Sequence, residues 1–251
     1  MRNPLLDPNA RVVIAHRGNR VAAPENTLVS FGQAVRLGAD AIEFDVRVTR
    51  DGVPVVIHDA DIDRTTDGHG SVESFTFDEL RRFDAAARSP QRAGSAIPIP
   101  SLEEVLDTFR ETPLVIEVKA FTAVDATERM IHRFAAENRV LLGSPETLVM
   151  NRLYRSGLSS CASMRDATRL IPIALAGLRP PQPDYHVLSI TRRFRGFPIP
   201  VLRMAAAARK VGVATHVWTV NDVREATALW SGGISGIVTD DPAAMLRARP
   251  R

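Results

Sequence analysis

The chain has 251 residues, of which 45% are apolar and 24% charged, which suits one barrel-sized domain or two smaller ones and excludes a disordered chain. Its 32 basic residues are 30 arginines and two lysines, and the net charge of +3 gives little support for a nucleic-acid partner. The single cysteine excludes an internal disulfide, and no apolar run is long enough to cross a bilayer.

Apolar runs and helical patterns alternate along the chain. Residues 11–15 form a continuous apolar run typical of a buried strand, and residues 27–37 have helical spacing followed by Gly38 as a stop. Further helices are predicted over residues 123–138, 145–156, 165–178, 199–210 and 222–230. Parallel strands are predicted to begin at Arg11, Ala39, Leu114, Val140, Leu158, His186, Val213 and Ile234. Eight such units predict a TIM (β/α)8 barrel, and a doubly wound sheet is the main alternative.

Residues 45–58 depart from this alternation. Asp51-Gly52 between two β-rich runs is typical of a hairpin, so we expect antiparallel strands here. If these two residues form the whole loop, Asp45 faces His58 across the hairpin. Residues 59–99 are too long for an ordinary barrel connection, and we expect them to be an insertion within one domain of residues 1–251.

Polar side chains fall near the predicted C-terminal ends of the strands, where TIM barrels build their active sites. Glu43 and Asp45 are two residues apart and therefore share a face of their strand. Glu117 and Lys119 share a face for the same reason. Three converging carboxylates without cysteine favour a hard divalent cation, Mg²⁺ or Ca²⁺. The alternative interpretation is a salt-bridge cluster of these carboxylates with Arg17, Arg47 and Lys119.

Two histidines accompany the carboxylates. His16 follows the first strand and His58 ends the hairpin, and imidazole titrates near neutrality, so the two rings are candidates for general acid and general base. Arg17 and Lys119 offer positive charge for an anionic substrate, with a planar fork and a point charge respectively.

A set of short motifs runs in order along most of the chain. They are His16-Arg17-Gly18, Pro24-Glu25-Asn26-Thr27, Glu43-Phe44-Asp45-Val46, His58-Asp59, Pro100-Ser101-Leu102-Glu103-Glu104, Glu117-Val118-Lys119, Val217-Trp218-Thr219-Val220-Asn221 and Gly236-Ile237-Val238-Thr239-Asp240. This ordered set resembles the glycerophosphodiester phosphodiesterase family. The resemblance implies a TIM barrel with a small insertion after the His58 strand, and hydrolysis of a glycerophosphodiester to an alcohol and glycerol phosphate.

The resemblance also implies roles for individual residues. The family's metal ligands match Glu43, Asp45 and Glu117, and its acid–base residues match His16 and His58. The sequence leaves open which histidine is the acid. It also leaves open whether the nucleophile is the glycerol 2-hydroxyl or water.

Residues that match the family's substrate contacts complete the predicted site. Arg17 and Lys119 match positions that contact phosphate, and Trp218 matches one that packs against the glycerol part of the substrate. We expect a small-molecule phosphodiester partner, no nucleic acid and no stable membrane insertion. The first ten residues lack the apolar core of a signal peptide, so we expect a cytoplasmic protein. The oligomeric state stays open.

Two other functions remain open. Lysophospholipase D activity keeps the same machinery but needs an apolar surface for an acyl chain, for which the insertion offers Phe75, Phe77 and Phe83. A non-catalytic phospholipid-binding barrel would be favoured by loss of a histidine or a carboxylate, and none is lost. The arginine-rich residues 191–195 suit an anionic group of the substrate or an anionic membrane surface, and a solvated loop is the simpler interpretation.

Overall fold

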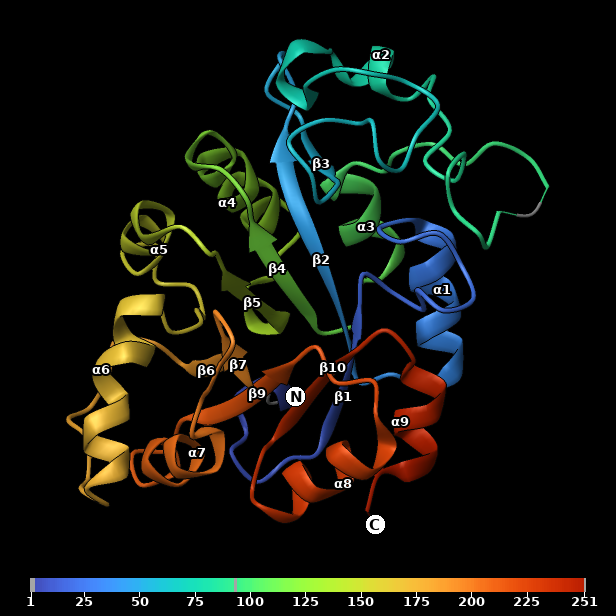
Figure 1. Cartoon of the computed structure of the whole chain (residues 1–251). Helices are drawn as coiled ribbons and strands as arrows, with labels where there is room; N and C mark the ends of the chain where they lie inside the picture. Colours follow the sequence, from blue (N-terminus) through green and yellow to red (C-terminus); the bar gives the residue numbers. More distant parts are fainter. Residues whose placement is uncertain (1–2, 93, 251) are drawn as a thin grey trace.

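The computed structural model describes residues 3–92 and 94–250 and is built around a curled parallel sheet (Figure 1). Its strands lie in the order β5-β4-β2-β1-β10-β9-β6. Their bounds are β1 Val12–His16, β2 Ala41–Val48, β4 Leu114–Val118, β5 Val140–Gly143, β6 Val187–Thr191, β9 Ala214–Trp218 and β10 Gly236–Thr239. Most of these strand residues are buried, as continuous apolar runs predict for a sheet covered on both faces.

The two edge strands, β5 and β6, are joined by residues 158–162, which the sequence predicts as a strand. Ser160 pairs with Leu142 of β5, and Cys161 pairs with Val187 of β6, both in parallel. Only Ser160 and Cys161 of this segment make bridges to its neighbours, so the paired stretch is shorter than predicted. It still occupies the eighth strand position, and the prediction of a TIM-like α/β barrel is confirmed.

Helices surround the sheet and alternate with its strands in the described part of the chain (Figure 1). Their bounds are α1 Leu28–Leu37, α3 Leu102–Thr108, α4 Val124–Arg133, α5 Thr147–Leu153, α6 Met164–Leu175, α7 Val201–Arg209, α8 Val223–Ser231 and α9 Pro242–Ala248, with short 3₁₀ turns η1 Pro4–Leu6, η3 Phe121–Ala123 and η4 Glu137–Arg139. The predicted boundaries of α1 have a clear physical basis. The Thr27 side chain accepts from the Ser30 backbone N–H, and Gly38 ends the helix with φ 92°.

Strand β3 (Pro54–Val56) pairs antiparallel with β2, as predicted, but the predicted register is wrong by one residue. Arg47 lies opposite Val55, so the loop contains three residues, 50–52, instead of two. Gly52 adopts φ 81°, and the Thr49 N–H closes the loop by donating to the Val53 carbonyl at 3.0 Å. The left-handed conformation of the glycine accommodates the additional residue.

The register shift changes the residue opposite Asp45. The N–H of Ile57, instead of a group of His58, donates to the Asp45 carbonyl oxygen at 3.1 Å. His58 therefore lies beyond the paired strands, in the segment that leads into the following region.

Residues 59–99 lie at the end of the barrel toward which β2 points (Figure 1). They contain η2 Val72–Ser74 and α2 Phe77–Leu80, and Ile62, Val72, Leu80 and Ile99 form a small apolar core with Val55 and Ile57 of the β3 segment. Treating them as an insertion within a single domain of residues 1–251 stays a prediction. No helix in the described ranges has the length and apolar character needed to span a membrane.

Candidate active site

The C-terminal ends of the strands open into a cavity of about 1120 Å³. The residues that the sequence predicts for the site all line it: His16, Arg17, Glu43, Asp45, His58, Glu117, Lys119 and Trp218. They come from β1, β2, β4 and β9 and from the segments that follow them or β3. The barrel therefore brings together groups that lie as far apart in the sequence as His16 and Trp218.

Three carboxylates form a compact cluster at one side of this cavity. Glu43 and Asp45 on β2 and Glu117 on β4 each offer an oxygen, and these atoms lie within 4.8 Å of one another. Glu43 and Asp45 are buried, and burial together with the nearby Asp45 charge raises the pKa of Glu43 to about 8. An all-oxygen donor set with two buried carboxylates and a partly exposed third fits a hard divalent cation.

Asp45 has the most partners of the three carboxylates. Lys119 Nζ lies 2.9 Å from its Oδ1, Arg17 Nε lies 3.2 Å from its Oδ2, and Asn26 Nδ2 donates to Oδ2 at 2.9 Å. Burial alone would raise the pKa of Asp45, but the charges of Lys119 and Arg17 outweigh burial and lower it. Lys119 also contacts Glu117. Two of the three cations named in the salt-bridge interpretation are thus present at the cluster.

His16 is held between two carboxyl groups. Its Nδ1 lies 2.7 Å from Asp240 Oδ1, and its Nε2 lies 3.9 Å from Glu43 Oε2. Burial lowers the pKa of His16, but the hydrogen bond with Asp240 and the charge of Glu43 outweigh burial and raise it. Asn221 in turn donates to Asp240 Oδ2 at 2.8 Å.

Asp240 has no assigned role in the sequence analysis, although it belongs to a quoted motif. It directly follows β10, and β10 pairs with β1, the strand that ends in His16. In a closed barrel the last strand pairs with the first. This rule could have predicted that Asp240, after the last strand, lies near His16, at the end of the first.

His58 has a similar arrangement on the other side of the cluster. Its Nδ1 lies 2.6 Å from Asp59 Oδ1, and Arg47 Nε donates to the His58 carbonyl oxygen at 2.9 Å. Arg47, the third cation of the salt-bridge interpretation, is therefore hydrogen-bonded to the backbone of this segment. Arg64 Nε contacts Asp59 Oδ2 at 2.5 Å, which anchors the carboxyl group that holds the ring.

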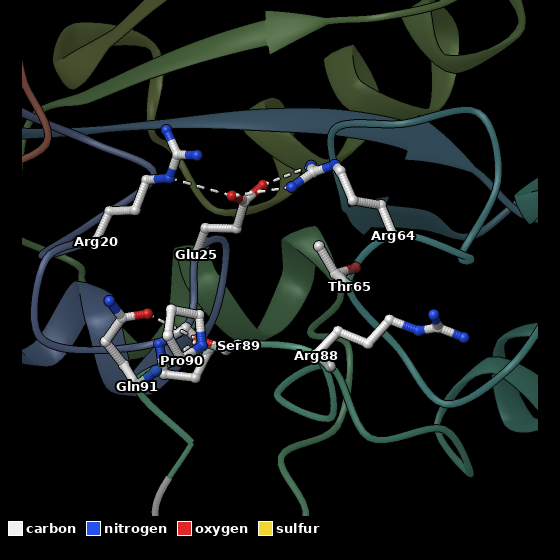
Figure 2. Close-up of a pocket in the computed structure, with 10 residues that line it drawn as sticks. Arg20, Glu25, Arg64, Thr65, Arg88, Ser89, Pro90 and Gln91 are labelled. Carbon is white, nitrogen blue, oxygen red and sulfur yellow. Dashed lines mark hydrogen bonds and ion pairs between the residues drawn. The ribbon is translucent and has the colours of Figure 1, made fainter.

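A smaller cavity of about 240 Å³ lies between the loop after β1 and residues 64–91. Figure 2 shows Glu25 between the guanidinium groups of Arg20 and Arg64, with ion-pair distances of 3.2 and 2.8 Å. Glu25 Oε1 also accepts from Arg17 Nη1 at 2.8 Å. Glu25 thus connects Arg17, at the main cavity, to Arg64, which also holds Asp59.

One wall of the main cavity, formed by segments that follow the acidic cluster in the sequence, is apolar. It is lined by side chains from α6, from the segment after β6 and from α7: Met164, Ala167, Ile171, Phe194, Ile199 and Met204. Trp218, 43% exposed, stands at the end of β9 and also lines the cavity. The cavity therefore combines a charged sector with a sector suited to an apolar group.

The chain is similar to known proteins over most of its length. The model of the glycerophosphoryl diester phosphodiesterase family matches residues 16–244. A glycerophosphodiester phosphodiesterase from Caldanaerobacter subterraneus is 29% identical, over 94% of this chain and 96% of that protein. A lysophospholipase D from Rattus norvegicus is 26% identical, over 92% of this chain and 84% of that protein.

Solved structures share the fold. A phosphodiesterase from Oleispira antarctica, solved in complex with the product sn-glycerol-3-phosphate, superposes with a TM-score of 0.78 at 24% identity. The similarity covers 95% of this chain and 96% of that one.

Proposed function

Because the chain belongs to the glycerophosphoryl diester phosphodiesterase family, we propose that it hydrolyses glycerophosphodiesters to glycerol phosphate and an alcohol in the main cavity. The observation that carries this proposal is the placement of two carboxylate-bound histidines beside a cluster of three carboxylates. We also propose a cytoplasmic location.

His16 and His58 carry the acid–base chemistry in this proposal. In each ring a carboxylate holds Nδ1, Asp240 in one case and Asp59 in the other, which leaves Nε2 for exchange of a proton with the substrate. One ring accepts the proton of the attacking hydroxyl. The other donates a proton to the departing alkoxide oxygen as its bond to phosphorus breaks. Attack by water gives glycerol phosphate directly, whereas attack by the glycerol 2-hydroxyl gives a cyclic phosphate that water then opens to glycerol phosphate.

The charged sector of the cavity binds the phosphate. Arg17 and Lys119 face the carboxylate cluster and offer charge to the phosphate oxygens. Glu43, Asp45 and Glu117 would hold a divalent cation, Mg²⁺ or Ca²⁺. When bound, such a cation supplies Lewis-acid stabilisation of the charge that develops on the phosphate.

Trp218 packs against the glycerol part of the substrate in this proposal. Its indole is 43% exposed at the mouth of the cavity, where a bound glycerol group would cover it. An amphipathic ring suits a ligand that is apolar on its carbon face and polar on its hydroxyls.

A lysophospholipid is the second candidate substrate, and the apolar wall of the cavity favours it. Phe75, Phe77 and Phe83 pack against the small core of residues 59–99, so they do not supply the acyl-chain surface considered from the sequence. Instead Ile171 and Phe194, on the opposite wall, offer such a surface. The same phosphodiester chemistry would then release a head-group alcohol from a substrate that keeps its acyl chain.

Hydrolysis assays with glycerophosphocholine, glycerophosphoethanolamine and lysophosphatidylcholine, each with Mg²⁺, Ca²⁺ or EDTA, test both candidates. We expect turnover of at least one substrate that depends on the metal. Absence of turnover in every combination would contradict the enzyme proposal, and full activity of EDTA-stripped protein would contradict the metal proposal.

Histidine variants test the acid–base assignment. We expect His16→Ala and His58→Ala each to lower kcat by roughly one hundredfold or more. His132→Ala is the matched control, because His132 is exposed on α4 and pairs with Glu137. Near-wild-type kcat in either of the first two variants would contradict the assignment.

A further inference from the structure

A short hairpin follows β6 and is formed by β7 (Arg193–Phe194), labelled in Figure 1, and β8 (Phe197–Pro198). Phe194 lines the cavity, so the hairpin lies beside it. Phe194 pairs with Phe197, so the two rings project from the same face of the hairpin. The turn residues Arg195 and Gly196 both have positive φ, 49° and 85°, as a tight two-residue hairpin requires. The turn therefore holds two phenyl rings in solvent, with exposed fractions of 41% and 75%.

The hairpin is also basic. Arg192, Arg193 and Arg195 are exposed, and residues 191–200 contain no acidic side chain. Arg195 stacks over the Phe194 ring at 5.5 Å from its centroid, and Arg193 donates to the Gly196 carbonyl oxygen. Of these three arginines, only Arg192 pairs with a carboxylate in the part of the chain that the structure describes. Two guanidinium groups thus remain without an acidic partner beside the exposed rings.

Further exposed apolar side chains lie at the same end of the barrel. Each follows the C-terminal end of a strand or begins a helix there: Phe121 after β4, Leu148 in the first turn of α5, Met164 at the start of α6 and Trp218 at the end of β9. Single exposed apolar residues are ordinary, but a group around one opening marks an interaction surface. Met164, Phe194 and Trp218 also line the cavity, so this surface borders its mouth.

We propose that the β7–β8 hairpin and these neighbouring side chains dock the mouth of the barrel on an anionic phospholipid surface. Aromatic rings beside arginines match such a surface, because the rings enter the boundary of head groups and acyl chains while the guanidinium groups contact phosphates. Phe194 belongs both to the hairpin and to the apolar wall of the cavity, so a lipid at the surface enters beside it. The inference holds for either proposed substrate, and the docking is peripheral.

Cosedimentation of the whole chain with vesicles tests this proposal. We expect binding to vesicles of phosphatidylcholine mixed with phosphatidylglycerol, weaker binding to pure phosphatidylcholine, and loss of binding as salt increases. Phe197→Ser and Arg195→Gln should each weaken binding by roughly fivefold. Leu178→Ser is the matched control, because Leu178 is 60% exposed just beyond the C-terminal end of α6, the opposite end from Met164.

Tryptophan fluorescence gives a second readout. The chain has two tryptophans: Trp218 at the mouth of the cavity and Trp230, which is buried in α8. We expect anionic vesicles to shift the emission to shorter wavelength in the wild type but not in Trp218→Phe.

Several outcomes would overturn the docking proposal. They are no binding to anionic vesicles at low salt, equal weakening by Leu178→Ser and Phe197→Ser, or binding without a change in Trp218 emission. A dimer seen by sedimentation velocity that Phe197→Ser dissociates would assign the surface to a second copy of the chain. Because Phe197 does not line the cavity, Phe197→Ser should hydrolyse soluble glycerophosphocholine at the wild-type rate, which separates loss of docking from failure of the proposed activity.

Discussion

Lys119 is one of two lysines in a chain with 30 arginines, and its largely buried side chain lies between two carboxylates. Arginine at this position would keep the charge but spread it over a larger planar group. We therefore expect Lys119→Arg to lower kcat/KM by about tenfold or more, which is about 1.4 kcal/mol of transition-state stabilisation. Lys210→Arg is the matched control, since Lys210 is exposed and its Nζ donates to the Gly177 carbonyl. Equal activity of the two variants would contradict a specific role for Lys119.

Asp240 is the residue that positions His16. Asp240→Asn keeps the shape but removes the charge that stabilises a protonated imidazole, so we expect kcat to fall by roughly one hundredfold with a smaller change in KM. The charge of Asp240 raises the pKa of His16, so its loss should move the corresponding limb of the pH–rate profile to lower pH. Asp184→Asn, at an exposed site before β6, should change neither property. A lower rate with an unmoved pH profile would indicate a structural role only.

The buried side chain of His216 affects the stability of the barrel at acid pH. It is buried on β9, and burial lowers its pKa to about 4 despite a hydrogen bond with the Leu5 backbone. The unfolded chain therefore binds a proton at higher pH than the native chain does, and stability is lost as pH falls from about 6.5 toward 4. We expect His216→Gln to reduce the slope of the unfolding free energy against pH in this range, by at most about 1.4 kcal/mol per pH unit. An unchanged slope, measured by urea unfolding, would contradict this account.

At the scale of elements, two glycines have a left-handed backbone, but only one of them also packs closely against another element. Gly52 in the β2–β3 loop has φ 81° and open space where an alanine methyl would lie, whereas Gly18 after β1 has φ 88° and would place that carbon 2.7 Å from the Ser30 backbone of α1. We expect Gly52→Ala to cost about 1 kcal/mol of unfolding free energy and Gly18→Ala more than twice as much. Gly18→Ala should also lower activity, because it displaces the segment that carries His16 and Arg17. If urea unfolding showed the same loss of unfolding free energy for both variants, the close contact of Gly18 with α1 would not explain the effect of Gly18→Ala.

At the scale of the whole molecule, the carboxylate cluster connects metal binding to stability. A cation that binds only the native barrel should stabilise it by about 2.7 kcal/mol at a free concentration one hundred times its Kd. We expect Glu43→Gln to lose most of this gain, because it removes a ligand. In EDTA the same variant should unfold at a higher temperature than the wild type, because a neutral amide removes the free-energy cost of burying the Glu43 carboxyl beside Asp45, which raises its pKa to about 8. Thermal unfolding with Mg²⁺, Ca²⁺ and EDTA measures both effects, and a wild-type metal response in Glu43→Gln would contradict the ligand assignment.

The barrel was predictable from the sequence because its strands are buried on both faces and must be apolar runs separated by helical patterns. Boundaries were less predictable where local conformation decides them. The helix predicted over residues 123–138 ends at Arg133, because Ala135, two residues further on, takes a positive φ of 47°. The register of the β2–β3 hairpin depended on whether its loop held two or three residues, which the Asp51-Gly52 signal does not distinguish.

By itself, the sequence determined the TIM-like barrel and the gathering of its site residues at one end. His16, Arg17, the three carboxylates and Lys119 lie at or near the C-terminal ends of parallel strands, which meet at that end, and the antiparallel hairpin brings His58 back beside them. Only the tertiary structure decided how these groups are held. Asp240 contacts His16 because the last strand of the barrel, β10, pairs with the first, β1. Glu25 links the site to residues 59–99 through its ion pair with Arg64. The apolar wall and the exposed hairpin also became visible only there. These features depend on contacts between segments distant in sequence, which are fixed by side-chain packing and register and leave no periodic pattern in the chain.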